Sequence, residues 1–220
     1  VLCSFDNDSK SISLNKNVIN LLKESNSQNL STIKFWLNDL VQYNILRYVS
    51  EFNSTDYGFP FLKLYHTYTM RSVAPLCNYE KIHSSFRGQG LITAAKPDYF
   101  LFVNLHKNAD VKESINYADK FITQDVFQWQ SPNSTSQDSE IGQNLINNFA
   151  RQINLHLFVR KFEQVEGITQ PFTYLGKVIT HKDSATGNKP ITMHFALKNR
   201  VPEELYMDFL TRTDKIVVKE

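Results

Sequence analysis

Hydrophobic positions recur at helical spacing in the first part of the chain. Residues 12–25 and 31–43 place apolar side chains three and four residues apart, and each segment has a serine, Ser13 or Ser31, that can cap a helix. The next residues, 44–49, are rich in β-branched and aromatic side chains and predict a short strand. Two helices and a strand outline a winged-helix-like unit. The second helix offers a single lysine, Lys34, and also carries Asp39, which favours helices that pack and join this chain to what precedes it over DNA binding.

From about residue 66 the pattern changes to that of strands. Residues 99–105 are apolar almost throughout, which is typical of a strand covered on both faces. Residues 153–159 alternate between apolar and other side chains, and a turn rich in Ser, Gly and Asn joins 172–180 to 191–198 as in a hairpin. Short helices are predicted at 70–77, capped by Thr69, and from Pro202 onward, and loops are predicted at 52–64 and 87–98.

Several strands at short spacing with few helices predict an α+β fold. We expect two domains: a helical, winged-helix-like coupler segment over residues 1–65, and a curved, β-barrel-like domain flanked by helices over residues 66–220. The length suffices for a hydrophobic core without disulfides or structural metal.

Composition narrows the range of functions. The chain has 220 residues with 24 basic and 22 acidic side chains, so any nucleic-acid contact must use a local patch. It has two cysteines, Cys3 and Cys77, which is too few for a disulfide framework or a four-cysteine zinc site. No apolar run reaches the roughly 20 residues of a membrane span. The first residue is Val1, which suggests a fragment of a longer chain, and we expect a cytoplasmic protein.

Several catalytic motifs are absent from the sequence. The nearest approach to a phosphate loop, around Gly88 and Gly90, lacks the Lys-Ser/Thr pair, so we expect no ATP binding. The six histidines are scattered, and none has another four residues away, so no metal site and no catalytic residue is predicted. Mid-strand histidines such as His156 and His194 are expected to be hydrogen-bonded within the sheet.

One nuclease-like pattern forms the basis of an alternative hypothesis. Asp98 follows Pro97 and precedes Asp110 and Lys112, as in the Pro-Asp…Asp-x-Lys arrangement that holds a divalent ion and supports an attacking water. The pattern is short and degenerate. It keeps a divalent-metal nuclease as the alternative to a binding module.

The segment 117–139 has an unusual concentration of aromatic, amide and carboxylate side chains. Such a mixture suits a pocket that stacks a planar nucleobase and reads its edge. The base-binding residues predicted from this segment are Tyr117, Asp119, Phe127, Trp129, Gln130 and Ser131. The competing interpretation is that the rings fill the core while the amides face water, and composition alone favours it.

A basic window near the end of the chain offers contacts to phosphates. Residues 177–200 hold five cations against a single aspartate, Asp183. The phosphate-binding residues predicted from this window and its surroundings are Lys107, Arg160, Lys177, Lys182, Lys189, Lys198 and Arg200.

Four segments carry a family resemblance: 68–74, 102–107, the run from Tyr117 through 127–131, and 172–197. Together they resemble the C-terminal target recognition domain of superfamily-two helicases that carry a phospholipase-D-type nuclease. This layout is that of SauUSI-type, ATP-dependent type IV restriction enzymes, which cut modified DNA. The nuclease signature itself, His-x-Lys-x4-Asp, is absent from this chain.

The resemblance implies a DNA-binding domain that reads 5-methylcytosine or 5-hydroxymethylcytosine by base flipping, in an SRA-like barrel. It implies double-stranded modified DNA as the partner, together with the upstream helicase and nuclease of the same polypeptide. No cofactor is expected in this chain, because ATP and magnesium belong to the upstream domains. A further alternative is a protein-interaction tail that only docks the motor.

Overall fold

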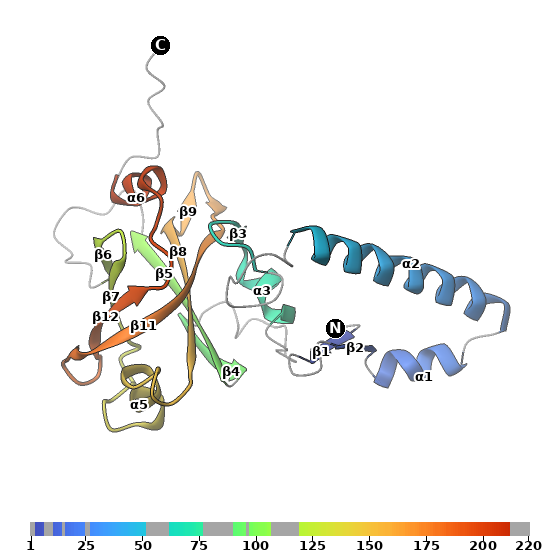
Figure 1. Ribbon diagram of the computed structural model, residues 1–220, viewed down its shortest axis with the longest axis horizontal. Helices are drawn as coiled ribbons and strands as arrows, with labels where there is room; N and C mark the ends of the chain where they lie inside the picture. Colours follow the sequence, from blue (N-terminus) through green and yellow to red (C-terminus); the bar gives the residue numbers. More distant parts are fainter. Residues whose placement is uncertain are drawn as a thin grey trace, which may run out of the picture.

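A computed structural model of the chain describes residues 3–6, 11–14, 16–24, 27–51, 62–76, 90–95, 97–106 and 119–211 (Figure 1). The helices are α1 Lys16–Glu24, α2 Ser27–Glu51, α3 Met70–Leu76, α5 Glu140–Ile146 and α6 Glu203–Leu210. The strands are β1 Cys3–Asp6, β2 Ser11–Leu14, β3 Thr67–Tyr68, β4 Leu91–Ala95, β5 Asp98–His106, β6 Lys120–Thr123, β7 Val126–Gln130, β8 Asn154–Phe162, β9 Gln164–Val165, β10 Ile168–Thr169, β11 Phe172–Thr186 and β12 Thr192–Leu197.

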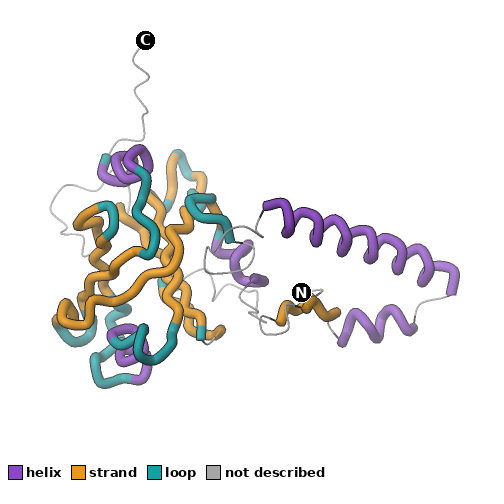
Figure 2. The backbone as a smooth tube through the Cα atoms, viewed as in Figure 1, coloured by secondary structure: helices purple, strands orange, loops and turns teal. Residues whose placement is uncertain are grey.

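The centre of the molecule is a curved sheet of eight strands. Seven of them follow the order β4-β5-β8-β11-β12-β7-β6, and β3 pairs with β11 beside this path. Neighbours are antiparallel except β5 and β8, which run parallel. Figure 2 shows helices α3, α5 and α6 around the strands, and α1 with α2 to one side. The predicted α+β class with a curved sheet is confirmed. The two strands at the ends of this order, β4 and β6, do not pair with each other in the described residues. The sheet is therefore not a closed barrel.

The sheet buries both of its faces over its central strands, because successive side chains of a strand point to opposite sides. On one side, residues such as Leu101, Leu157 and Phe195 form the larger core with α5 and α6. On the other side, Phe100, Phe158 and their neighbours form a smaller core with α3. This arrangement explains why the predicted strands 99–105 and 153–159 are so apolar, and both are confirmed as β5 and β8.

A bulge in β11 contributes to the curvature of the sheet. The pairing of β11 with β8 shifts between Tyr174 and Gly176. Gly176 has a φ of +87°, which disfavours any residue with a side chain. A Cβ there would also lie 3.0 Å from Leu64 Cδ1 and 3.1 Å from Asn199 Nδ2. Gly176 therefore lets the sheet bend where two neighbouring segments approach it closely.

The strand predicted at 44–49 is wrong, because α2 continues as a helix to Glu51. No Gly or Pro interrupts residues 27–51, so a helix that has nucleated can propagate through the β-branched and aromatic residues. Inside this stretch Asn44 Nδ2 donates to the carbonyl of Leu40 at 2.7 Å. The predicted helix at 12–25 begins later, because Ser11–Leu14 form β2 before α1. The division into residues 1–65 and 66–220 stays a prediction.

Two further elements differ from the sequence-based expectation. The predicted loop 87–98 contains β4, which pairs with β5 through Leu91 and Ile92. The helix α5 has no counterpart in the prediction, and Ser139 caps it by accepting a hydrogen bond from Gly142 N at 3.0 Å. The hairpin of β11 and β12, the Thr69 cap of α3 and the helix after Pro202 are confirmed.

Candidate nucleic-acid interface

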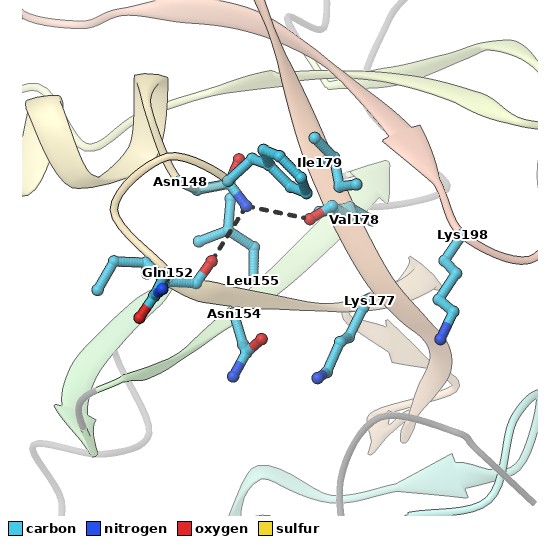
Figure 3. A pocket seen from close by; sticks show the side chains of 10 residues that line it. Asn148, Gln152, Asn154, Leu155, Lys177, Val178, Ile179 and Lys198 are labelled. Atoms are coloured by element: carbon cyan, nitrogen blue, oxygen red, sulfur yellow. Dashed lines mark hydrogen bonds between the residues drawn. The ribbon is translucent and has the colours of Figure 1, made fainter.

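A hollow of about 400 Å³ opens where the turn after α5 meets β8, β11 and the end of β12. We call it the β11 hollow. Its lining combines cations, amides and apolar side chains: Asn148, Phe149, Gln152, Ile153, Asn154, Leu155, Lys177, Val178, Ile179 and Lys198. Figure 3 shows eight of these residues labelled around the opening.

Two of the predicted phosphate-binding lysines lie side by side at this hollow. Lys177 is on β11 and Lys198 follows β12, and Lys198 N donates to the carbonyl of Lys177 at 3.0 Å. Residues directly opposite each other on antiparallel strands project to the same face. In Figure 3 both side chains extend in the same direction, and Lys177 lies between Asn154 and Lys198. Two ammonium groups on one rim provide a local positive field in a chain whose net charge is only +2.

The wall of the hollow depends on the buried side chain of Asn148. Strand β8 pairs with β11 only as far as Val178, and Asn148 continues the pairing beyond that point. Its Nδ2 donates to the carbonyls of Ile153 at 3.1 Å and Val178 at 3.4 Å, while its Oδ1 accepts from Thr180 N at 2.9 Å. Asn148 is therefore a side-chain substitute for a strand and fixes the turn that lines the hollow.

The aromatic residues predicted to stack a base lie elsewhere. Phe127 and Trp129 are 0% and 3% exposed and belong to the larger core, where Trp129 stacks on Phe195 with ring centroids 5.6 Å apart. They fill the core, as the competing interpretation holds, and stacking a base would require them to leave it. Tyr117 lies outside the described residues. In the described residues, Phe127 and Trp129 therefore lie in the core and do not line the β11 hollow.

The polar residues predicted beside these rings support the β6–β7 region. Asp119 accepts a hydrogen bond from Gln130 N at 2.7 Å, and burial raises the pKa of Asp119 to about 6, against the opposing effect of that bond. Ser131 is buried, and its Oγ accepts from Ile191 N at 2.9 Å. Gln130 Nε2 donates to Thr192 Oγ1 at 3.5 Å. These contacts hold the hairpin of β6 and β7 in register with β12.

The remaining predicted phosphate contacts are spread over the molecule. Lys182 and Lys189 are exposed near the β11–β12 turn, and Lys107 lies outside the described residues. Arg160 is buried. Its guanidinium donates to Asn104 Oδ1 at 2.6 Å and to the carbonyl of Gln170 at 2.9 Å, so it is already occupied within the protein. Arg200 donates through Nε to Gln124 Oε1 at 2.9 Å. Of the predicted cations that the structure describes, Lys177 and Lys198 line the hollow.

The nuclease-like pattern is only partly visible. Asp98 lies at the start of β5 and is buried, and its Oδ1 accepts a hydrogen bond from His156 Nε2 at 2.8 Å. His156 Nδ1 lies 2.9 Å from the hydroxyl of Tyr174. Asp110 and Lys112 lie outside the described residues. Within the described part of the chain, Asp98 belongs to a buried network across β5, β8 and β11, and His156 is the hydrogen-bonded sheet histidine that the sequence predicts.

Eight of the ten lining residues were not predicted as site residues. Three of them, Asn148, Phe149 and Gln152, also lie outside every predicted element. They follow a helix that the sequence pattern did not reveal. The signal in the sequence is a single aromatic residue, Phe149, among amide side chains just before the predicted strand 153–159. That signal acquires meaning only when the fold brings the two lysines to the same place.

The fold and the hollow together define a mixed α+β domain with a small cationic opening beside strands β8, β11 and β12 of its curved sheet. The chain matches the family described as Domain of unknown function (DUF3427) over residues 62–209 and belongs to that family, a domain found in helicase-associated proteins. No match was found among curated proteins. None of the helices in the described ranges combines the length and apolarity required to cross a bilayer.

Proposed function

We propose that this chain is the DNA-binding target recognition domain of an ATP-dependent type IV restriction endonuclease of the SauUSI kind, and that it reads 5-methylcytosine or 5-hydroxymethylcytosine by base flipping. The observation that carries the proposal is the lysine pair Lys177 and Lys198 on the rim of the β11 hollow. Family membership and the resemblance to helicase-linked recognition domains support the same class of partner.

The hollow has the size and chemistry for one extruded base. Its volume of about 400 Å³ falls in the range of small-ligand sites, roughly 300–1,000 Å³. The two lysines would contact phosphates of the DNA strand that carries the extruded base. The amides of Asn154 and Gln152 can hydrogen-bond the edge of a pyrimidine. Ile179, which is 43% exposed, offers an apolar contact for a methyl group on cytosine C5.

The proposed site must supply enough binding free energy to offset the cost of extruding a base from the duplex. Extruding a base costs a few kcal/mol, which phosphate contacts, stacking and edge hydrogen bonds must offset. Burying one methyl group contributes about 0.8 kcal/mol, so methylation alone changes affinity about fourfold. The domain itself binds, and the cutting and the ATP- and magnesium-dependent steps belong to the helicase and nuclease of the same cytoplasmic polypeptide.

The test is equilibrium binding of the full chain to modified and unmodified duplexes of one sequence at several salt concentrations. We expect tighter binding to the modified duplex, and a salt dependence whose slope falls by about 2 in the double variant K177Q/K198Q. The matched control is K23Q/K34Q, which removes the same charge from exposed positions on α1 and α2. Equal affinity for both duplexes rejects reading of the modification, and equal slopes for the two double variants reject the hollow as the site.

A further inference from the structure

The turn that lines the β11 hollow holds an aromatic ring in solvent. Phe149 is 77% exposed, although it directly follows Asn148, which is 3% exposed. An isolated exposed apolar residue is common on protein surfaces. This ring differs from such a residue because it lines a hollow that also contains two lysines and two half-buried or exposed amides.

The backbone that carries the ring is fixed on both sides. Ile153 N donates to the carbonyl of Asn148 at 2.8 Å, and Gln152 N donates to the carbonyl of Phe149 at 3.2 Å. Gln152 has a φ of +56°, a left-handed conformation that closes the turn. Asn148 ties the same turn to β11 through Val178 and Thr180. A ring on a turn held this firmly loses little conformational freedom when it binds a ligand.

We infer that Phe149 is the stacking platform of the β11 hollow, on which one unpaired pyrimidine lies with its strand's phosphates at Lys177 and Lys198. This inference rests on the proposed function and adds the residue that meets the base. Every base has a π-face, so the ring contributes affinity for any base. The preference for a modified pyrimidine comes from the amides and Ile179. The core rings Phe127 and Trp129 have no part in this contact.

The experiment compares the full chain with F149A, F149L and F149W, using a duplex with one 5-methylcytosine opposite an abasic position, which lowers the cost of extrusion. We expect F149A to weaken binding about 10-fold, F149W to keep the wild-type affinity, and F149L to behave like F149A, because leucine lacks a π-face. The control is I168A in β10, since Ile168 is 68% exposed and lies outside the hollow, and its affinity stays that of wild type. All four variants keep the wild-type melting temperature, because both side chains are exposed.

Two results would overturn the inference. Wild-type affinity in F149A removes any role for the side chain, and wild-type affinity in F149L reduces it to an apolar contact. In either case the proposed function survives if the modified duplex is still preferred and K177Q/K198Q still lowers the salt slope. If the wild-type chain binds modified and unmodified duplexes equally, and K177Q/K198Q has the same salt slope as the wild type, the proposed function is rejected and the inference with it.

Discussion

At the scale of single residues, burial shifts the pKa of His156 and of Asp119 toward the neutral form of each group. His156 is completely buried, and desolvation lowers its pKa, although the hydrogen bond with Asp98 acts in the opposite direction. A neutral imidazole has one donor and one acceptor, so Nε2–H donates to Asp98 and Nδ1 accepts from Tyr174. Asp119 shows the corresponding effect for an acid, since burial raises its pKa to about 6. Both groups serve the packing of the sheet.

The raised pKa of Asp119 predicts a pH dependence of stability. Its ordinary pKa is 3.8, so between pH 4 and 6 the folded chain binds the proton more tightly than the unfolded chain, and stability falls as the pH rises through this window. At pH 7.5 the folded chain holds a charged, poorly solvated carboxylate. We expect D119N to be more stable there by about 1–2 kcal/mol, because the amide oxygen can still accept from Gln130 N.

Urea unfolding of wild type and D119N at pH 4, 5, 6 and 7.5 measures this effect. The stability difference should grow across the window and level off above pH 6. A difference that stays constant from pH 4 to 7.5 would show that Asp119 keeps its ordinary pKa in the folded chain. The exposed residue Asp183, changed to Asn, provides the control for removing one carboxylate.

At the scale of secondary-structure elements, the sequence predicted best where one periodicity dominated. The strand β5 was predictable because apolar residues cover both of its buried faces, and β8, β11 and β12 were predictable from short apolar or alternating runs bounded by turns. The end of α2 was not predictable from the sequence. The preference of β-branched residues for strands is weak, and a long uninterrupted helix overrides it. Of the site, the sequence predicted Lys177 and Lys198 as phosphate-binding members of one basic window, residues 177–200. Their proximity depends on the register of β11 with β12, which no local pattern specifies.

The junction of α5 with the sheet leads to the second prediction. Replacing Asn148 by Ala removes three hydrogen bonds and leaves Thr180 N–H without its acceptor where β8 stops pairing. We expect N148A to lower the free energy of unfolding by about 2–3 kcal/mol. Hydrogen exchange should show faster exchange at the amides of Ile153 and Thr180, since both depend on the turn.

The matched control is N147A, because Asn147 is half-buried and its side chain donates to Gln143 Oε1 at 3.0 Å, on α5 and not on β11. Its cost should stay below about 1 kcal/mol. If N148A and N147A have the same stability, the side chain of Asn148 does not substitute for a strand, and the turn holds its shape by its backbone alone.

At the scale of the whole molecule, burial separates the helical first part from the sheet. The helix α2 exposes large apolar residues, among them Phe35 at 69% and Leu46 at 69%. The sheet instead encloses two cores that hold most of the buried side chains of the described residues. The two tryptophans report on these two environments, since Trp36 lies on α2 and Trp129 lies in the larger core.

These tryptophans provide the third prediction. Trp129 is 3% exposed, so W129A leaves a cavity and should cost about 3–5 kcal/mol of stability. Trp36 is 63% exposed, so W36A should change stability by less than about 0.5 kcal/mol. Urea unfolding followed by circular dichroism measures both values without relying on either indole. Iodide quenching should strongly reduce the emission of W129F, which retains Trp36, and barely affect W36F. Efficient quenching of W36F would mean that Trp129 is accessible to solvent, and stacking of a base on Trp129 would then again compete with Phe149.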